Sequence, residues 1–174
     1  MLLPTSTPAI RDLAPGDSMK LLTELVHAAY APHAARGLRY WGTHQTVDDT
    51  ATRFRSGHGL VAEFNGTYVG TITVRPPQPQ SPVSLYRDLH TWTISQFAVA
   101  PSFKDRHLGK ALHQAAIAHV LRNGGKSMAL DTAAPAVALI AMYLSWGYRV
   151  VGRHDWQPHT NYVSIVMSLP LAVT

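Results

Sequence analysis

Cysteine is absent from the 174-residue chain. Without a thiol there is no disulfide framework, no thiol nucleophile, and none of the usual cysteine-containing zinc or iron–sulfur sites. Charged residues are scarce as well, at 14%, which excludes the compositions typical of disordered and coiled-coil proteins. Long apolar runs are also missing, since none approaches the roughly 18–20 residues of a membrane span. We therefore expect a soluble, cytoplasmic protein with no membrane partner.

The chain has enough apolar side chain for a core, because hydrophobic residues make up 46% of it. Its length fits one ordinary globular unit, so we expect residues 1–174 to form a single domain. The first ten residues lack a basic region and are interrupted by Pro4 and Pro8. A signal peptide is therefore not expected.

The formal net charge is +5, which would suit either a nucleic acid or an anionic small molecule. The basic residues are scattered and are not interleaved with aromatic residues on one element, so we expect no nucleic-acid partner. The ten histidines are dispersed too. His154 and Asp155 are adjacent in the chain, and adjacent residues on a strand point to opposite faces, so they would not hold a metal together. We expect no metal site.

Apolar periodicity, caps and turns predict an α/β (α+β) fold with a mixed, mostly antiparallel twisted sheet of about six or seven strands and about four flanking helices. Asn65-Gly66 predicts a hairpin turn, and Thr46 followed by two aspartates predicts a helix start. The proline-rich segment 75–82 predicts a surface loop. The expected strands cover residues 9–13, 59–64, 67–74, 90–99, 127–131, 148–153 and 162–169, and the expected helices cover about 18–29, 47–55, 108–123 and 135–147.

The segment between the strand ending near Pro101 and the helix starting near Leu108 is the most informative one. Gly109 and Ala111 are small enough for a ligand to approach the backbone, and the first helical turn presents unpaired N–H groups and a positive dipole end. This arrangement suits a pyrophosphate. Neither of the other common phosphate-binding patterns, G-x-x-x-x-G-K-[ST] or G-x-G-x-x-G, occurs here. The basic neighbours are Lys104, Arg106, His107 and Lys110.

Two motifs resemble those of the GNAT superfamily of N-acetyltransferases. The first is V-x-P at 99–101 followed by R-x-x-G-x-A at 106–111, which resembles the acetyl-CoA motif of that family. The second, Tyr143-Leu-Ser-Trp-Gly147-Tyr148, resembles the family pattern Y-x-x-x-G-[FY]. The order of elements over residues 9–169 is similar as well.

The resemblance implies acetyl-CoA as co-substrate and a fold in which the strand before the phosphate site splays from its neighbour. The strand edge that would pair with the pantetheine arm is then Phe97, Ala98 and Val99. The backbone amides that would hold the pyrophosphate are those of Arg106, His107, Leu108, Gly109, Lys110 and Ala111.

The reaction implied is direct attack of a primary amine of a small molecule, or of a peptide, on the thioester in a ternary complex. Backbone N–H groups would stabilise the oxyanion. Tyr143 matches the phenol that protonates the departing thiolate. The alternative is a non-catalytic acyl-CoA-binding or regulatory module on the same fold.

The sequence departs from the family pattern in two places. Ala136 stands where many relatives have an asparagine that orients the cofactor, and Ile94-Ser95-Gln96 stands where relatives often have a glutamate that deprotonates the amine. The remaining carboxylates weighed as the base are Glu24, Glu63 and Asp131. None of them is assigned from the sequence.

The resemblance places the acceptor site at the first two helices and the late-strand loops, which correspond to residues 30–33, 39–41 and 154–157. Tyr30, Tyr40 and Trp41 are the candidate substrate-binding residues. These segments are aromatic and basic, so we expect a small amine that also has a carboxylate or aromatic group. The apolar final strand, Val163–Leu169, lies either in a homodimer interface or inside the sheet.

Overall fold

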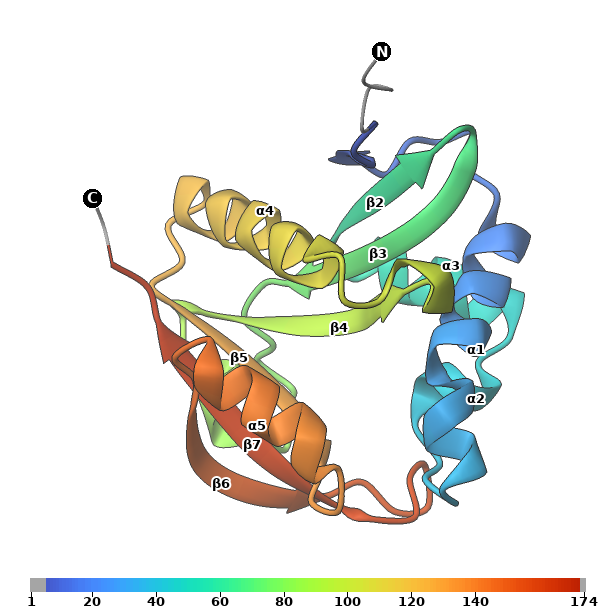
Figure 1. Cartoon of the computed structure of the whole chain (residues 1–174). Coiled ribbons are helices and arrows are strands. Elements are labelled where there is room, and N and C mark those ends of the chain that lie inside the picture. The colour runs from blue at the N-terminus through green and yellow to red at the C-terminus, as the bar shows by residue number, and fades with distance from the viewer. Residues whose placement is uncertain (1–5, 173–174) are drawn as a thin grey trace.

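A computed structural model describes residues 6–172 and contains a seven-stranded sheet in the order β1-β2-β3-β4-β5-β7-β6 (Figure 1). Only the β4–β5 pair is parallel, and the other neighbours are antiparallel. The predicted mixed sheet is therefore confirmed. The strands are β1 (Ala9–Asp12), β2 (His58–Phe64), β3 (Thr67–Arg75), β4 (Thr91–Val99), β5 (Ser127–Ala133), β6 (Arg149–Asp155) and β7 (Val163–Pro170).

Helices cover both faces of this sheet. On one face α4 and α5 pack over the main core, to which α4 contributes Leu112, Ala116 and Val120 (Figure 1). On the opposite face α1 and α3 bury Leu22 and Phe54 against β2. The helices are α1 (Met19–Ala35), α2 (Trp41–His44), α3 (Val47–Arg55), α4 (Leu108–Arg122) and α5 (Val137–Ser145), with 3₁₀ turns η1 (Ser84–Arg87) and η2 (Pro101–Phe103).

Local chemistry explains most element boundaries. The Thr46 side chain accepts from the Asp49 N–H while the Asp49 carboxylate accepts from the Thr46 N–H, which is a full capping box for α3. Asn65 and Gly66 both have positive φ, at 50° and 75°, as a two-residue hairpin turn requires. Ser18 caps α1 by accepting from the Leu21 N–H. These boundaries agree with the predicted ones.

Three segments differ from the sequence-based expectation. The single turn α2 was not predicted, and α1 continues through Pro32 to Ala35 instead of ending near residue 29. The proline-rich segment leads into η1, where Tyr86 is buried against β5 and β7. Gln78 in that segment donates to Thr93 on β4 at 2.7 Å. The segment therefore folds back onto the sheet instead of projecting from it.

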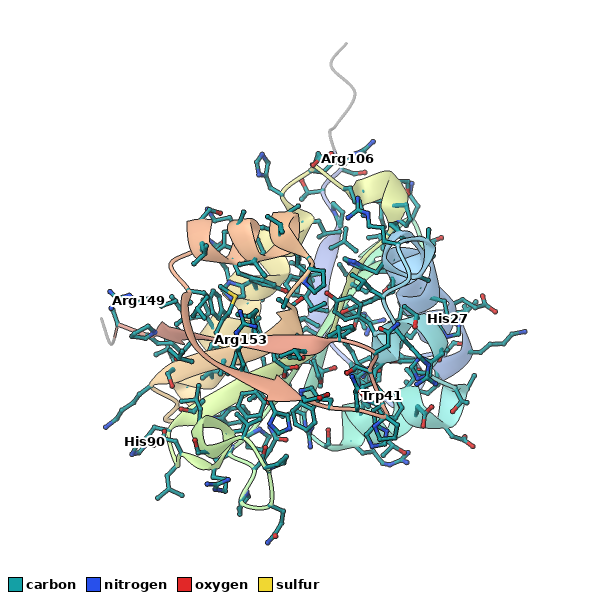
Figure 2. All side chains as sticks on the ribbon, turned by 90° about the horizontal axis from the view of Figure 1, so that it is seen from below. His27, Trp41, His90, Arg106, Arg149 and Arg153 are labelled. Carbon is teal, nitrogen blue, oxygen red and sulfur yellow. The ribbon has the colours of Figure 1, made fainter. Side chains whose placement is uncertain are left out.

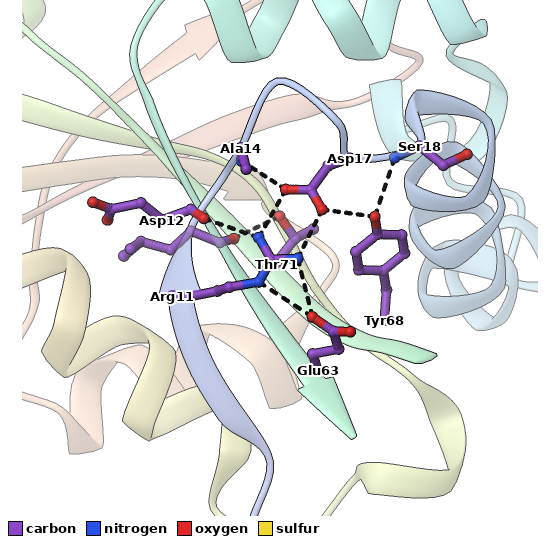
Figure 3. A network of polar contacts seen from close by, with 9 residues as sticks. Arg11, Asp12, Ala14, Asp17, Ser18, Glu63, Tyr68 and Thr71 are labelled. Carbon is purple, nitrogen blue, oxygen red and sulfur yellow. Dashed lines mark hydrogen bonds and ion pairs between the residues drawn. The ribbon is translucent and has the colours of Figure 1, made fainter. Parts of the chain in front are cut away.

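A closed polar network fixes the N-terminal edge of the sheet to the start of α1 (Figure 3). The Arg11 guanidinium on β1 lies 2.7 Å from Asp17 Oδ1 and 3.0 Å from Glu63 Oε2. The Tyr68 hydroxyl donates to Asp17 at 2.8 Å and accepts from the Ser18 N–H at 3.1 Å. The hydrogen bonds from Arg11 hold the pKa of Asp17 well below its usual range. Every charge in this group has a protein partner.

The sheet opens between β4 and β5. Their register contains three pairs, from Thr91↔Ser127 to Thr93↔Ala129, and stops there, although both strands continue. The edge of β4 from residue 94 to 99 is therefore free of β5 (Figure 1). This is the splay that the resemblance implied.

Candidate active site

A bulge in β4 shapes the opening in the sheet. Between the register pairs Thr71↔Ala98 and Thr73↔Ser95, β4 has two residues, Gln96 and Phe97, opposite one on β3. Gln96 adopts φ 47°, in the left-handed region that residues with a side chain seldom occupy. A bulge bends its strand and raises the local twist, so it carries β4 away from β5.

Buried hydrogen bonds hold this bulge in place. The Gln96 side chain is 2% exposed; its Oε1 accepts from Gln45 Nε2 at 2.8 Å and its Nε2 donates to Thr73 at 3.3 Å. From α1, the Tyr30 hydroxyl donates to the Phe97 carbonyl at 3.1 Å. Both amide atoms of Gln96 are therefore used by the protein. Neither Ser95 nor Gln96 has a carboxylate, so this stretch of β4 cannot deprotonate an amine.

One cavity, of about 540 Å³, lies between the free edge of β4, the start of α4 and the end of α5; we call it the α4 cavity. Seven of the residues predicted to bind the cofactor line it. They are Phe97, Ala98, Val99, His107, Leu108, Gly109 and Lys110.

The other two predicted cofactor residues do not line this cavity. The Arg106 guanidinium lies over the Phe103 ring, 5.1 Å from its centroid, and the side chain is at the periphery in Figure 2. The Ala111 N–H donates to the His107 carbonyl at 3.0 Å as the first bond of α4. The Leu108, Gly109 and Lys110 N–H groups precede that bond, so they are the ones without a partner inside the helix.

The start of α4 leaves room for a bulky anion. A methyl group added at Gly109 would meet Val99 at 3.6 Å and Phe97 at 3.7 Å, which are ordinary contacts. The protein's own packing therefore does not require glycine at this position. His107 and Asp105, with φ of 59° and 61°, turn the chain sharply before the helix. Free helix amides, an unpaired strand edge and open space at a glycine together fit the pyrophosphate and amide-containing arm of acetyl-CoA.

Tyr143 lies where two cavities meet. It is 6% exposed on α5, and it lines both the α4 cavity and a second cavity on the other side of the opening. Burial raises its pKa well above 10, so the phenol keeps its proton at neutral pH. Tyr30 and Phe97 also line both cavities. A protonated phenol at this junction can donate to a leaving group that develops negative charge.

The second cavity, of about 440 Å³, is bounded by α2, α3 and the diverging ends of β3, β4 and β5; we call it the β5 cavity. All three predicted substrate-binding residues, Tyr30, Tyr40 and Trp41, line it. The Trp41 ring stacks with the imidazoles of His44 and His159, with 5.4 Å between centroids in each pair. In Figure 2 Arg106 lies at the top of the view, and Trp41 lies below and to the right of its centre.

The β5 cavity also contains charged side chains. Three of them, which nothing in the sequence groups together, are Arg53, Arg75 and Asp131. Asp131 accepts from the Tyr86 hydroxyl at 2.6 Å and from Trp156 Nε1 at 2.9 Å. Arg53 donates to Gln45 Oε1 at 2.6 Å.

No sequence signal could have found the two arginines, because a basic residue in the last turn of a helix or at a strand end is usual. Arg39, in the predicted acceptor loop, instead donates to the Pro158 and His159 carbonyls.

The other carboxylates weighed as a base lie elsewhere. Glu24 is exposed on α1, and Glu63 belongs to the Arg11 network. Neither lines either cavity. Ala136 is buried at the N-cap of α5 without a side-chain cap, so an asparagine-type contact from this position is missing.

Within residues 6–172, no three histidine or acidic side chains gather as a metal-binding group. No helix in this range is both long and apolar enough to cross a membrane.

Comparison with known proteins agrees with this geometry. Residues 20–148 match the acetyltransferase (GNAT) family. A Bacillus subtilis (strain 168) protein, S-(2-succino)cysteine N-acetyltransferase, is 32% identical over 150 residues, which cover 85% of this chain and 88% of that protein.

Solved structures share the fold at lower identity. The ribosomal-protein-S18-alanine N-acetyltransferase of Escherichia coli superposes with a TM-score of 0.72 at 18% identity and covers 97% of this chain and 96% of its own. A GNAT family acetyltransferase from Elizabethkingia anophelis with acetyl-CoA bound gives 0.69 at 16% identity, with 94% and 98% covered.

Proposed function

This chain belongs to the GNAT family of acetyltransferases and is an N-acetyltransferase that uses acetyl-CoA; we propose that its acceptor is the primary amine of a small molecule bound in the β5 cavity. The observation that supports this most directly is the position of Tyr143 between the two cavities. One cavity has the features for the donor and the other has aromatic walls and opposite charges. A phenol at their junction faces the place where the two substrates would meet.

We assign the donor to the α4 cavity. The edge of β4 at Phe97, Ala98 and Val99 would pair with the extended arm of the cofactor. The amides at the start of α4 would hold its pyrophosphate, with Lys110 and Lys104 contributing positive charge. Arg106 would act on the pyrophosphate only by turning away from Phe103, and Ala111 would act only through its small size. When bound, acetyl-CoA supplies the thioester, and Tyr143 holds the proton that the departing thiolate needs.

We assign the acceptor to the β5 cavity. Tyr30, Tyr40 and Trp41 form its aromatic wall. Two aspartates also line it. Asp49 belongs to the α3 capping box, and we assign to Asp131, which Tyr86 and Trp156 hold in place, the role of drawing the acceptor ammonium toward the opening. The acceptor must be attacked from its neutral form, since only a free amine lone pair is nucleophilic. The proposal therefore predicts a rate that rises with pH until the amine is deprotonated.

The small-molecule class of acceptor is supported by the Bacillus subtilis relative, whose name gives a modified cysteine as its acceptor. S-(2-succino)cysteine is therefore the first amine to try on this chain. A peptide N-terminus is the competing acceptor, and it would have to enter the same cavity. A homodimer and a cytoplasmic location are further predictions of the sequence, to be checked by sedimentation and by cell fractionation.

The experiment is a thiol-release assay with acetyl-CoA and a panel of amines at equal concentration: S-(2-succino)cysteine, L-aspartate, L-phenylalanine, spermidine and a short peptide with a free N-terminus. We expect turnover with one or more of the small amines and little with the peptide. Faster turnover of the peptide would overturn the small-molecule assignment.

A calorimetric titration with CoA, using ATP as the anionic control, tests the donor cavity separately. We expect CoA to bind and ATP to bind far more weakly. CoA binding without turnover of any amine would favour the acyl-CoA-binding module.

A further inference from the structure

Two polar groups in the wall of the β5 cavity are buried without a partner. Arg75 Nε and the Ser95 hydroxyl are both shielded from solvent and have no hydrogen-bond acceptor or donor. Within residues 6–172, Arg75 makes no side-chain hydrogen bond or ion pair at all. A buried polar group without a partner costs free energy, and native proteins keep few of them. Such groups in a cavity wall point to a ligand that would satisfy them.

A second guanidinium shares this cavity. Arg53, from the last turn of α3, donates one hydrogen bond to Gln45 and has no carboxylate within ion-pair distance among the described residues. A guanidinium has five N–H donors, so most of those on Arg53 remain available. Gln45 in turn binds Gln96, which ties the position of Arg53 to the bulge in β4. Burial lowers the pKa of both arginines, as expected for cations without a counter-ion.

The strand register puts Arg75 and Ser95 on one side of the cavity. Arg75 is paired with Thr93, and Ser95 lies two residues further along β4, so both point to the same face of the sheet. This face is opposite the one covered by α4 and α5, because the alternate residue Ile94 packs into the core beneath those helices. Arg75 and Ser95 therefore line the β3–β4 side of the cavity and Arg53 lines it from α3, while Asp131 stands on β5.

We propose that Arg53, Arg75 and Ser95 form a binding subsite for a carboxylate of the acceptor, so that the enzyme acetylates small primary amines bearing at least one carboxylate. The assignment rests on the proposed acceptor role of the β5 cavity. An amino acid has the matching charges, with its carboxylate at the arginines and its ammonium toward Asp131. Arginine is suited to this because its planar fork can donate two parallel hydrogen bonds to one carboxylate.

The first test compares matched acceptors on the wild-type enzyme. L-phenylalanine and L-phenylalaninamide share the amine and the ring and differ in the carboxylate. The amide has the more easily deprotonated amine, so chemistry alone would make it the better acceptor. We expect the acid to have the lower KM by roughly 10-fold or more, since a charge-assisted pair is worth that much. An equal or lower KM for the amide would overturn the subsite.

The second test removes the charge from the protein. Arg75→Gln should raise the KM of the carboxylate acceptor by about 10- to 100-fold and leave the KM of phenylalaninamide unchanged. Arg55→Gln is the matched control, because Arg55 lies on the same helix as Arg53 but is exposed and bonded only to Thr52. It should change neither value. Equal losses for both acceptors in Arg75→Gln would mean a structural role and overturn the proposal.

A binding measurement separates this inference from the proposed function. Succinate has two carboxylates and no amine, so its binding, followed by calorimetry, requires no acetyl transfer. We expect succinate to bind the wild-type chain and to lose most of its affinity in Arg75→Gln and less in Ser95→Ala. Succinate binding with no turnover of any amine would leave the subsite standing and reject the acceptor function. Turnover of amines without any carboxylate preference, and without succinate binding, would reject the subsite alone.

Thermal unfolding checks that Arg75→Gln is folded. Since the Arg75 side chain has no hydrogen-bond or ion-pair partner among residues 6–172, its replacement should leave the unfolding temperature unchanged or raise it. A lower unfolding temperature would show that the guanidinium stabilises the fold, and this would contradict the assignment.

Discussion

Arg11, at the N-terminal edge of the sheet, and the pair Arg53 and Arg75, in the β5 cavity, differ in where their hydrogen bonds go. Arg11 is bound by Asp17 and Glu63, and Tyr68 completes the group, so each charge is matched inside the protein (Figure 3). Arg53 and Arg75 lie in a cavity and have no carboxylate partner among the described residues. Each of these three arginines adds one positive charge to the total, so a charge count does not distinguish them. What distinguishes them is whether their N–H groups have hydrogen-bond partners within the protein. An arginine with such partners stabilises the fold, whereas one without them is available to a ligand.

The largest expected effect concerns the junction between the cavities. Tyr143→Phe should lower kcat by about 100-fold or more, because the departing thiolate loses its proton donor. The ring packs against Trp146 and Tyr148 and no hydrogen bond to its hydroxyl is present among the described residues, so the unfolding temperature should hold. Steady-state kinetics with calorimetric CoA binding measures both. An unchanged kcat would place the proton donor elsewhere.

Changes in the network around Arg11 and Asp17 should have the opposite effect, lowering stability without lowering activity. Asp17→Ala leaves Arg11 and Tyr68 short of their shared partner, and we expect it to lower the free energy of unfolding by about 3 kcal/mol with kcat/KM unchanged. The pKa of Asp17 is held below its usual value, so its contribution is present above about pH 4 and is lost as the pH falls further.

Urea unfolding at neutral pH, with activity measured in parallel, checks the Asp17 prediction. Asp48→Ala, on the exposed first turn of α3 and outside the Asp49 capping bonds, is a control that should cost little. A loss of activity without a loss of stability would break the comparison.

A neutral, buried hydrogen bond between His113 and Tyr148 extends the comparison, because it makes the stability of the fold depend on pH. His113, on the buried side of α4, is 3% exposed and shares a 2.7 Å hydrogen bond with the Tyr148 hydroxyl. Burial lowers its pKa to about 4. The unfolded chain then takes up a proton below about pH 6.5 that the folded chain does not, so stability is full above that pH and falls between about 6.5 and 4. At pH 5 the loss from this group should be about 2 kcal/mol.

Urea unfolding of wild type and of His113→Asn at pH 7 and pH 5 isolates this contribution. The variant should lose stability at pH 7 but show a smaller further decrease at pH 5. Equal pH dependence in the two proteins would assign the effect to other histidines whose pKa burial also lowers, such as His33 and His119.

The smallest expected effect concerns the empty space beside Gly109, whereas the preceding predictions concerned hydrogen bonds. Gly109→Ala adds a methyl group that the protein accommodates at ordinary contact distances, so stability should be unchanged. We expect CoA affinity to fall by about 10-fold, because the methyl occupies the approach to the free amides of α4. Gly152→Ala, with nothing within 4 Å, is the matched control and should not change CoA affinity. Full CoA affinity in Gly109→Ala would mean that the pyrophosphate binds elsewhere.

The sequence predicted the local parts of this structure well. The Thr46 cap, the turn at Asn65-Gly66 and the start of α4 at Leu108 all depend on residues within a few positions of one another. The acetyl-CoA motif is also local in sequence, because its strand edge, loop and helix start follow one another along the chain. Seven of its predicted residues accordingly line one cavity.

The acceptor side could be predicted only in part. Tyr30, Tyr40 and Trp41 line the β5 cavity, and their binding of the acceptor stays a prediction. The arginines of this cavity, Arg53 and Arg75, come from a helix end and a strand end with no motif. Their significance depends on the absence of a partner, which is a long-range property of the folded chain. The single turn α2 was missed because four residues are too few to show helical periodicity.

The short register between β4 and β5 has a mechanical consequence. Among the described residues, three consecutive pairs from Thr91 to Thr93 form the whole backbone ladder between a four-stranded panel, β1 to β4, and a three-stranded panel, β5, β7 and β6. The two parts of the sheet are thus joined through hydrogen-bonded strands at one end only. A small rotation about that end is multiplied with distance from it, so the width of the opening at Tyr143 depends on how firmly those three pairs are held.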